Sequence, residues 1–336
     1  MNKPPTLGFI ACVTLAAMLL LIAAGVAGAA ESRTATGQVF VSSEKDDAVA
    51  AYSAASRQLI AVWRQCKRPR HLQLSPDRRR LYVACSDDNR VDVVDVASRK
   101  TVASLPVGDD PELFDLSPDG RTLYVSNEED GLLSAYDIAS GKKVFAIKVG
   151  EEPEGVKASP DGKRVYVTSE VANLVHVIDV ASRKLIKNIR VGNRPRRLLL
   201  AMDGKELWVT NELAASVSVI RTDTLEVVQT IAFTPKGFRA EDVTPVGLIA
   251  SSDGKRAYIG LGRANRVAVV DVASRRVLDY VLVGRRAWGL ALTRDNALLY
   301  VANGLSDDVS VVDTASNKAV TTLKAGRVPH SVAIDD

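Results

Sequence analysis

The chain has 336 residues with 44 basic and 40 acidic side chains, which gives a formal net charge of +4 at pH 7. This mild balance gives no reason to expect a nucleic acid or a charged membrane surface as partner. Aromatic residues make up only 5% of the chain, with three Trp and eight Tyr, so few side chains are available to stack on bases.

The N-terminal segment has the pattern of an export signal. Lys3 is followed by an uncharged run from Leu7 to Ala29, and Ala27-Gly28-Ala29 fits a small-residue cleavage site. We expect residues 1–30 to be a signal peptide, residues 31–36 a flexible lead, and the mature protein to be periplasmic. The uncharged run is also long enough to span a membrane, so retention of the segment as an anchor stays open.

Residues 37–336 repeat a unit of 42 residues. The residue that closes each V-x-V-x-D run recurs at intervals of 42, except for one interval of 50, at Ser53, Asp95, Asp137, Asp179, Arg221, Asp271 and Asp313. A second column has the same offsets and the same single irregularity, at Pro69, Pro111, Pro153, Pro195, Pro245, Ala287 and Pro329. The two columns together define seven copies of the unit.

Each copy has the pattern of four short strands. In residues 108–149 the turn Ser-Pro-Asp-Gly separates ELFDL from TLYVS, and the runs LLSAY and KVFAIKV follow. A period near 40 residues with four antiparallel strands is typical of a propeller blade. We therefore predict an all-β, single-domain, seven-bladed β-propeller over residues 37–336. The first copy lacks its first strand, so residues 328–334 should close the ring by pairing beside residues 38–42.

The repeated elements resemble a known family. The motifs Tyr124-Val125-Ser126-Asn127 and Tyr300-Val301-Ala302-Asn303 are similar to YVTN-type β-propeller repeats. More narrowly, the ordered set RPRHLQLS, DPELFDLS, EEPEGV, NRPRRL, TPVGL, GRANRVAVVD and LDYVLVGRRAW resembles the PQQ-dependent catabolism-associated β-propeller proteins. This resemblance implies an exported propeller that acts beside periplasmic quinoprotein dehydrogenases or transport components, and it implies no catalytic residues.

One face of the propeller gathers the residues that vary between copies. The residue after each proline column should lie at the entrance of the central channel, and six of these positions form the predicted ligand or partner site: Arg70, Glu112, Glu154, Arg196, Trp288 and His330. The charged half would orient a polar group, and the apolar half would contact a flat one. In the resembled family Trp is usual at the position of His330, which weakens the prediction of an aromatic wall there.

Two alternatives bear on this site. Arg70 neighbours Glu112 and Arg196 neighbours Glu154 in blade order, so the charges could simply pair with one another. The eight additional residues between blades 5 and 6, around Phe233 to Asp242, would either cover the mouth or form a neutral insertion. If the site binds a ligand, replacing Arg70 and Trp288 together by Ala should abolish binding and leave the fold intact.

The sequence contains no pattern for a metal centre, a nucleophile or a cofactor. It has only three histidines, at positions 71, 176 and 330, with no zinc-binding spacing, and it has no G-x-S-x-G elbow, phosphate-binding loop or haem motif. We expect no metal, no cofactor and no catalytic set. The cysteines Cys66 and Cys85 should lie on one face of a hairpin, and either a disulfide or two separate thiols fits their spacing.

These observations favour a monomeric, exported, non-catalytic propeller that binds a small ligand or a partner protein in quinoprotein-dependent alcohol catabolism. The first alternative is a lactone hydrolase, because seven-bladed lactonases share this architecture and Glu and His at the mouth could serve as base and acid. The second alternative, binding of single-stranded DNA, is disfavoured by the weak charge and the scarce aromatic residues.

Overall fold

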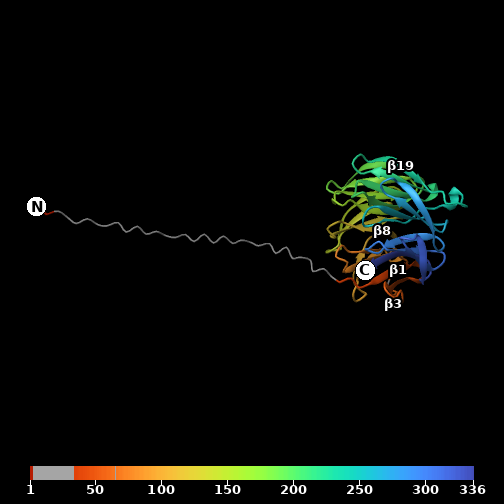
Figure 1. Cartoon of the computed structure of the whole chain (residues 1–336). Coiled ribbons are helices and arrows are strands. Elements are labelled where there is room, and N and C mark those ends of the chain that lie inside the picture. Colours follow the sequence, from red (N-terminus) through yellow and green to blue (C-terminus); the bar gives the residue numbers. More distant parts are fainter. Residues whose placement is uncertain (3–33, 65) are drawn as a thin grey trace. The chain divides into compact units, whose positions relative to one another are not determined.

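Seven four-stranded antiparallel sheets form the unit from Ala35 to Asp336 (Figure 1). The structure, a computed structural model, describes residues 1–2, 34–64 and 66–336. The expected signal peptide therefore lies almost wholly outside the described residues, as do residues 31–33 of the expected lead. None of the helical segments in the described part of the chain is long and apolar enough to cross a membrane.

Each sheet is one blade, whose strands follow one another from the central channel to the rim. Blade 1 consists of β28 (Pro329–Asp335), β1 (Gln38–Ser43), β2 (Ala48–Ser53) and β3 (Leu59–Trp63). Blade 2 consists of β4 (Pro69–Leu74), β5 (Arg80–Cys85), β6 (Arg90–Asp95) and β7 (Lys100–Pro106). Blade 3 consists of β8 (Pro111–Leu116), β9 (Thr122–Asn127), β10 (Leu132–Asp137) and β11 (Lys143–Lys148).

The other four blades follow the same plan. Blade 4 consists of β12 (Pro153–Ala158), β13 (Arg164–Ser169), β14 (Leu174–Asp179) and β15 (Lys184–Arg190). Blade 5 consists of β16 (Pro195–Ala201), β17 (Glu206–Asn211), β18 (Ser216–Arg221) and β19 (Glu226–Ala232). Blade 6 consists of β20 (Leu248–Ala250), β21 (Arg256–Gly260), β22 (Arg266–Asp271) and β23 (Arg276–Leu282). Blade 7 consists of β24 (Ala287–Leu292), β25 (Leu298–Asn303), β26 (Asp308–Asp313) and β27 (Lys318–Lys324).

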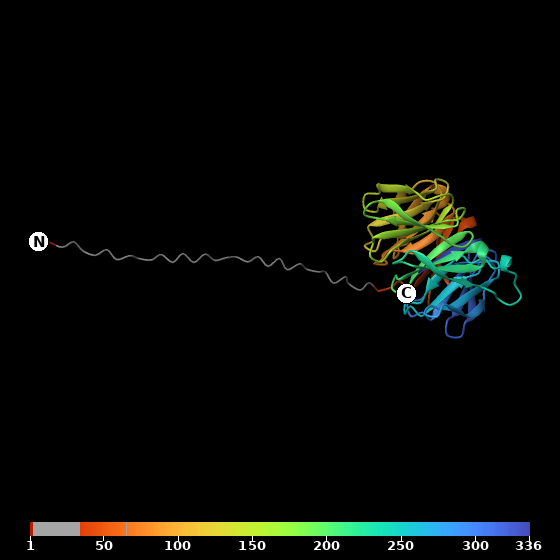
Figure 2. The same ribbon diagram turned by 90° about the horizontal axis from the view of Figure 1, so that it is seen from above.

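The C-terminal strand closes the ring. β28 pairs antiparallel with β1, with Val39 opposite Ile334 and Val41 opposite Val332, and Figures 1 and 2 show the C-terminus beside the first strand. The inner strands pack in a complete cycle from β4 through β8, β12, β16, β20 and β24 to β28 and back to β4. The seven-bladed fold and its closure are thus confirmed. At the start of the unit, Thr36 is tied to the closing strand, because its Oγ1 donates to Asp335 at 2.6 Å.

Turn carboxylates shape the hairpins. In the first hairpin of blade 3, Asp119 accepts hydrogen bonds from the Ser117 hydroxyl at 2.5 Å and from the Arg121 backbone N–H at 3.1 Å. In the outer hairpin of the same blade, Asp137 accepts bonds from the hydroxyl and the N–H of Ser140. Such local bonds stabilise tight turns, so these aspartates have a structural role.

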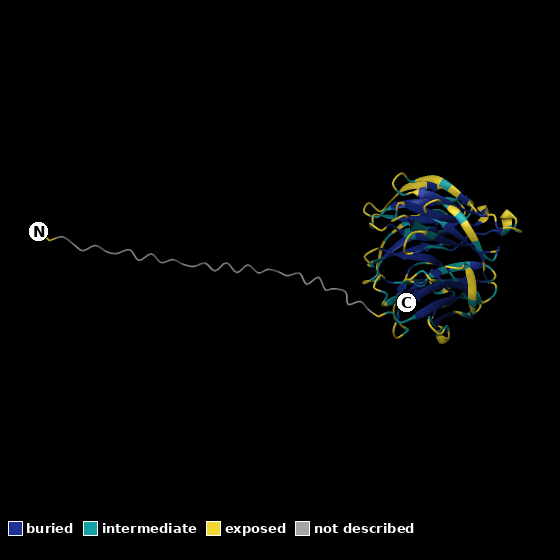
Figure 3. Ribbon diagram, viewed as in Figure 1, coloured by how far each residue is buried: buried dark blue, intermediate teal, exposed yellow. Residues whose placement is uncertain are grey.

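The hydrophobic core is divided among the interfaces between blades. Second and third strands are almost wholly buried and outer strands are largely exposed (Figure 3). Between blades 5 and 6, for example, Trp208, Phe233 and Ile259 belong to one cluster of buried side chains. Because every blade is buried on both faces, the ring supports its innermost strands rigidly, and these strands carry the candidate site.

Candidate functional site

The innermost strands enclose a central channel. Its cavity of about 300 Å³ is lined by residues from β4, β8, β12, β16, β24 and β28 and from the β20 segment. Most of the lining is apolar, and the titratable side chains in it are His71, Asp115, Lys157, Arg197 and His330. A mostly apolar cavity with a few convergent polar groups is the usual form of a small-molecule site.

A bulge near the start of β4 and of β16 changes which side chains face the site. The pairing register shifts between Pro69 and Leu72 in blade 2 and between Pro195 and Leu198 in blade 5. Such a bulge re-aims the side chains within it. For this reason the two residues after the proline of blade 5, Arg196 and Arg197, both contact Glu154 at the site.

Hydroxyl groups of the neighbouring blade hold these bulges in place. Thr168 Oγ1 donates to the carbonyl of Arg196 at 2.9 Å and accepts the Gly155 N–H at 2.7 Å. Ser42, Ser126 and Thr210 donate in the same way to the carbonyls of Arg70, Glu154 and Val246. These hydroxyls occupy the variable position of the Y-V-x-N motif, where the sequence pattern alone did not indicate a role for them.

The charged residues predicted at the mouth are paired with one another. Arg70 Nη1 lies 2.5 Å from Glu112 Oε1, and its Nε lies 3.4 Å from Glu44 Oε1. Arg196 Nη2 lies 3.3 Å from Glu154 Oε1, and its Nη1 contacts Glu170. The structure therefore contains the ion pairs expected if the mouth charges pair with one another. The side chains of Arg70 and Arg196 are each only 9% exposed.

His330 and Trp288 lie together on the less charged side of the mouth. Their rings meet edge to face with centroids 4.8 Å apart, and the guanidinium of Arg286 stacks over the Trp288 ring at 4.9 Å. The indole Nε1 is buried and has no hydrogen-bond partner among the described residues. All six predicted positions thus gather near the channel entrance, but only His330 among them lines the cavity itself.

Arg197 is the main residue that sequence reasoning missed. Its Nη2 lies 3.2 Å from Glu154 Oε1 and 3.4 Å from His330 Nε2, and it lines the channel. Its Nη1 is buried without a hydrogen-bond partner in the described chain. The second residue after the proline column reads His71, Leu113, Gly155, Arg197, Gly247, Gly289 and Ser331, so the two titratable residues in that column were a readable signal.

Burial and neighbouring charges set the protonation states at the site. Burial opposes ionisation of Glu154, but Arg196, Arg197 and Arg70 together lower the pKa of this carboxyl to about 2. Burial and the charge of Glu154 raise the pKa of Glu112 well above its usual range, against the pull of Arg70.

The two histidines of the channel have lowered pKa values. Burial, followed by the charges of Arg197 and Lys157, lowers the pKa of His71 to about 3. Burial and then Arg70 and Arg197 lower the pKa of His330 well below its ordinary value. Both imidazoles are therefore neutral at pH 7.

The inserted loop between blades 5 and 6 packs at the side of the ring. Phe233 is 1% exposed in the core cluster between these blades, and Phe238 packs against the same cluster and lies 5.5 Å from the Arg266 guanidinium. The loop carries a short helical turn, η4 (Ala240–Asp242), at the periphery of the propeller (Figures 1 and 2). None of the loop residues, all of which the structure describes, lines the channel cavity.

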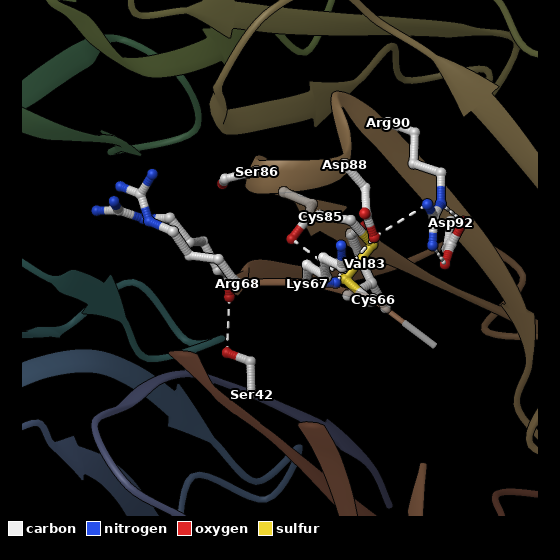
Figure 4. The surroundings of a disulfide bond; sticks show 12 residues. Ser42, Cys66, Lys67, Arg68, Val83, Cys85, Ser86, Asp88, Arg90 and Asp92 are labelled. Carbon is white, nitrogen blue, oxygen red and sulfur yellow. Dashed lines mark hydrogen bonds and ion pairs between the residues drawn. A yellow bond between two sulfur atoms is a disulfide. The ribbon is translucent and has the colours of Figure 1, made fainter. Parts of the chain in front are cut away.

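Cys66 and Cys85 are joined by a disulfide bond. A disulfide links Cys66, in the connection from β3 to β4, with Cys85 at the end of β5, and their Cα atoms are 5.1 Å apart (Figure 4). Asp92 lies beside the pair and is held by Arg90, whose Nε donates to it at 2.8 Å. The bond fixes the chain that leads into β4, the strand that carries Arg70.

Solved structures of similar fold include several proteins named as lactonases. The periplasmic gluconolactonase of Pseudomonas aeruginosa is 22% identical, with a TM-score of 0.76 over 89% of this chain and 99% of that one. A putative 6-phosphogluconolactonase of Bacteroides fragilis is 18% identical, with a TM-score of 0.74 over 90% of this chain and 99% of that one. A functionally unknown protein of Desulfotomaculum acetoxidans is 16% identical, with a TM-score of 0.77 over 89% and 99% of the two chains. No curated protein sequence matches.

A family model described as lactonase, 7-bladed beta-propeller, matches residues 69–188 and 181–334. This match overturns the expectation of a non-catalytic binder in quinoprotein-dependent catabolism and favours the hydrolase alternative. The narrower resemblance to PQQ-associated propellers is not confirmed, and a partner from that pathway has no support in these matches. The chain belongs to the lactonase family of seven-bladed β-propellers.

Proposed function

We propose that this protein is a hydrolase that opens the ring of a lactone inside its central channel. The observation that carries the proposal is the guanidinium of Arg197, which lines the channel and has one buried nitrogen, Nη1, unpartnered among the described residues. His71 and His330, both neutral, line the same cavity. The volume of about 300 Å³ suits a small cyclic ester.

Arg197 is placed to stabilise the oxyanion of the tetrahedral intermediate. Glu154 holds its Nη2 at 3.2 Å, which leaves Nη1 free to donate to the carbonyl oxygen as negative charge develops. A pre-oriented donor in a water-poor site is worth far more than the same donor in water. The ion pair between Arg197 and Glu154 therefore has a catalytic use, because it fixes the orientation of the guanidinium.

His330 supplies a second donor. A guanidinium has no lone pair to offer, so Nε2 of His330 accepts from Arg197 at 3.4 Å and the proton of the neutral ring is on Nδ1. Nδ1 is buried and has no hydrogen-bond partner in the described part of the chain. We assign it to the same carbonyl oxygen as Arg197.

His71 is the proposed general base. Its imidazole is neutral at pH 7 but weakly basic, because its pKa is about 3. The proton that it takes from a water molecule, as the water oxygen bonds to the carbonyl carbon, therefore stays on it only until the ring oxygen accepts it. The bond from that carbon to the ring oxygen then breaks, and the proton on His71 passes to the ring oxygen. The products are a carboxylic acid and a hydroxyl group on one open chain, so atoms and charge balance without a metal or a redox partner.

Turnover of lactones by the pure protein tests the proposal. In a pH-stat, wild-type protein should release acid from γ- or δ-lactones faster than buffer does, and His71→Asn should lower kcat by about 100-fold or more. His176→Asn is the matched control, because His176 is a buried histidine of β14 that bonds to Asn188 and does not line the channel. No acceleration on any lactone, or equal losses in the two variants, contradicts the assignment.

We also propose that the activity is periplasmic. The export pattern of residues 1–30 and the disulfide between Cys66 and Cys85 both fit an oxidising compartment. The similar gluconolactonase of Pseudomonas aeruginosa is described as periplasmic. Fractionation of expressing cells, followed by N-terminal sequencing of the mature chain, tests both the compartment and the cleavage site.

A further inference from the structure

Three carboxylates of blade 3 converge at the mouth face, outside the channel. Asp110 lies in the connection from β7 to β8, Glu112 lies in β8, and Glu128 follows β9. One carboxylate oxygen of each lies within 4.8 Å of the others. Asp110 has a left-handed backbone with φ of 42°, and its carbonyl accepts the Glu128 N–H at 3.3 Å, so the loop conformation holds two of the three residues together.

Glu112 is the buried member of this group and has an oxygen without a partner. Its side chain is 1% exposed. Oε1 is used by Arg70 at 2.5 Å and by Arg68 at 3.2 Å. Oε2 is buried and accepts no hydrogen bond from the described residues. A buried carboxylate oxygen left unpaired is costly, particularly beside two further carboxylates.

An open hollow of about 540 Å³ adjoins the group and is lined by two of its members, Asp110 and Glu128. Its lining contains Arg68 and Lys148 and six carboxylates: Asp110, Glu128, Glu129, Asp130, Glu151 and Glu152. The hollow is therefore strongly negative, is open to solvent and has room for water molecules around a bound ion.

We propose that Asp110, Glu112 and Glu128 bind a divalent cation of the calcium type. Carboxylate oxygens are the ligands that Ca²⁺ prefers, and water from the hollow would complete a coordination shell of six to eight oxygens. The charge also favours a cation: with Glu112 ionised on binding, three carboxylates face the guanidinium of Arg68, which Asp87 also contacts, and Arg70 is shared with Glu44. The ion would use the unpartnered Oε2 of Glu112, since Oε1 is taken by Arg68 and Arg70.

This site is independent of the proposed lactone hydrolysis, and it differs from the sequence-based expectation of no metal. That expectation rested on histidine spacing, which is uninformative about a carboxylate site. The competing explanation is a proton shared between Glu112 and Glu128, which would satisfy the same oxygen without an ion.

Calcium binding to the metal-stripped full-length protein separates the two explanations. Titration calorimetry with CaCl₂ at neutral pH and moderate salt should show one site, with a dissociation constant on the order of 10⁻⁴ to 10⁻³ M. The melting temperature should rise with calcium concentration, because the ion binds only the folded state. Glu128→Gln should abolish both effects, and its own Tm without calcium should stay near the wild-type value.

Glu151→Gln is the matched control, because Glu151 lines the same hollow but is outside the group. It should bind calcium as the wild type does. Wild-type protein with no binding heat and no Tm shift overturns the proposal in favour of the shared proton. Equal weakening in Glu128→Gln and Glu151→Gln also overturns it, since that result would mean diffuse attraction to the acidic hollow.

Discussion

At the scale of single residues, the site depends on contacts between adjacent blades. The mouth residues are held by ion pairs within the ring and by hydroxyls that reach the next blade. The identity of the charged residues could be predicted from the repeat, because they vary where the scaffold is constant. The burial of these charged side chains could not be predicted, since it depends on how closely the seven inner strands approach one another. Arg197 was missed for a different reason: strict alternation along the strand turns it away from the channel, and only the bulge between Pro195 and Leu198 brings it there, although its place in the column of second residues was a readable signal.

Thr168→Val should reveal the structural role of the hydroxyls. The substitution keeps the shape but leaves the carbonyl of Arg196 and the N–H of Gly155 without their buried partner. We expect a loss of about 1–3 kcal/mol in the free energy of unfolding, measured by urea denaturation. Thr322→Val, at an exposed position of β27, is the control and should change little. Equal stability of both variants would show that the bond does not matter.

Removing the Arg70 guanidinium should destabilise the fold. Arg70→Ala leaves the buried Glu112 carboxylate without its nearest cation, and loss of one partner of a buried pair typically costs about 3–5 kcal/mol. The double replacement of Arg70 and Trp288 is therefore a poor test of binding, contrary to the expectation that it would leave the fold intact. Trp288→Ala alone, at a half-buried position, is the usable variant. Thermal denaturation of Arg70→Ala, Trp288→Ala and the double variant checks this prediction: the two proteins that lack Arg70 should melt well below Trp288→Ala.

Stability should fall in acid because His71 is neutral in the folded protein. The pKa of His71 is about 3 in the folded protein, well below its ordinary 6.5, so between these values the unfolded chain binds a proton that the folded protein does not. The stability is thus fully present above pH 6.5 and is lost as pH falls toward 3. His71→Asn should flatten this part of the curve of unfolding free energy against pH. An unchanged slope in the variant would contradict the assigned protonation state.

At the scale of strands and loops, the repeat predicted four strands in each blade and one insertion, but not the short helical turns such as η1 (Glu44–Asp46). The expected strands of residues 108–149 appear as β8 to β11, and the long interval appears as the loop from blade 5 to blade 6. The packing position of this loop could not be predicted, because a sequence with Phe233 and Phe238 is equally compatible with a loop that covers a ligand and with one that covers the hydrophobic core. The structure packs both against the cluster between blades 5 and 6.

The disulfide should contribute measurably to stability. Cys66 and Cys85 are 19 residues apart, and closing a loop of this length stabilises a protein by about 3 kcal/mol in the chain-entropy model. The variant with both cysteines replaced by Ser should lose roughly that amount in denaturant unfolding. Mass spectrometry of the unreduced wild-type protein must first show that neither cysteine is a free thiol. Two free thiols would mean that the bond does not form.

At the scale of the whole molecule, the termini determine whether the ring exists. The missing first strand of blade 1 and the surplus strand at the C-terminus could be matched from sequence alone, because both keep the register of the repeat. What the sequence could not provide was the cavity, since its volume depends on the small residues that let inner strands approach. Gly289 is one such residue: a Cβ there would lie 2.4 Å from the carbonyl oxygen of His330.

Truncation after Gly326 should open the ring. It removes β28, which carries His330 and pairs with β1, and so exposes the edge of β1 and the side of β24. We expect aggregation, or a large fall in melting temperature, because unpaired edges are templates for association. A soluble truncated protein that melts at the wild-type temperature would contradict the role of β28 in closure.

The kinetics of the double variant His71→Asn, Arg197→Met test the central claim most directly. If the channel is the hydrolytic site, a lactone that the wild type hydrolyses should be turned over by the variant no faster than by buffer. Met keeps much of the volume of Arg197 but removes the donor, and circular dichroism with the melting curve verifies that the fold is kept. We predict loss of kcat/KM by at least about 1,000-fold, since a donor and a base each contribute 100-fold or more. A folded variant that retains wild-type kcat/KM would show that lactones are hydrolysed elsewhere.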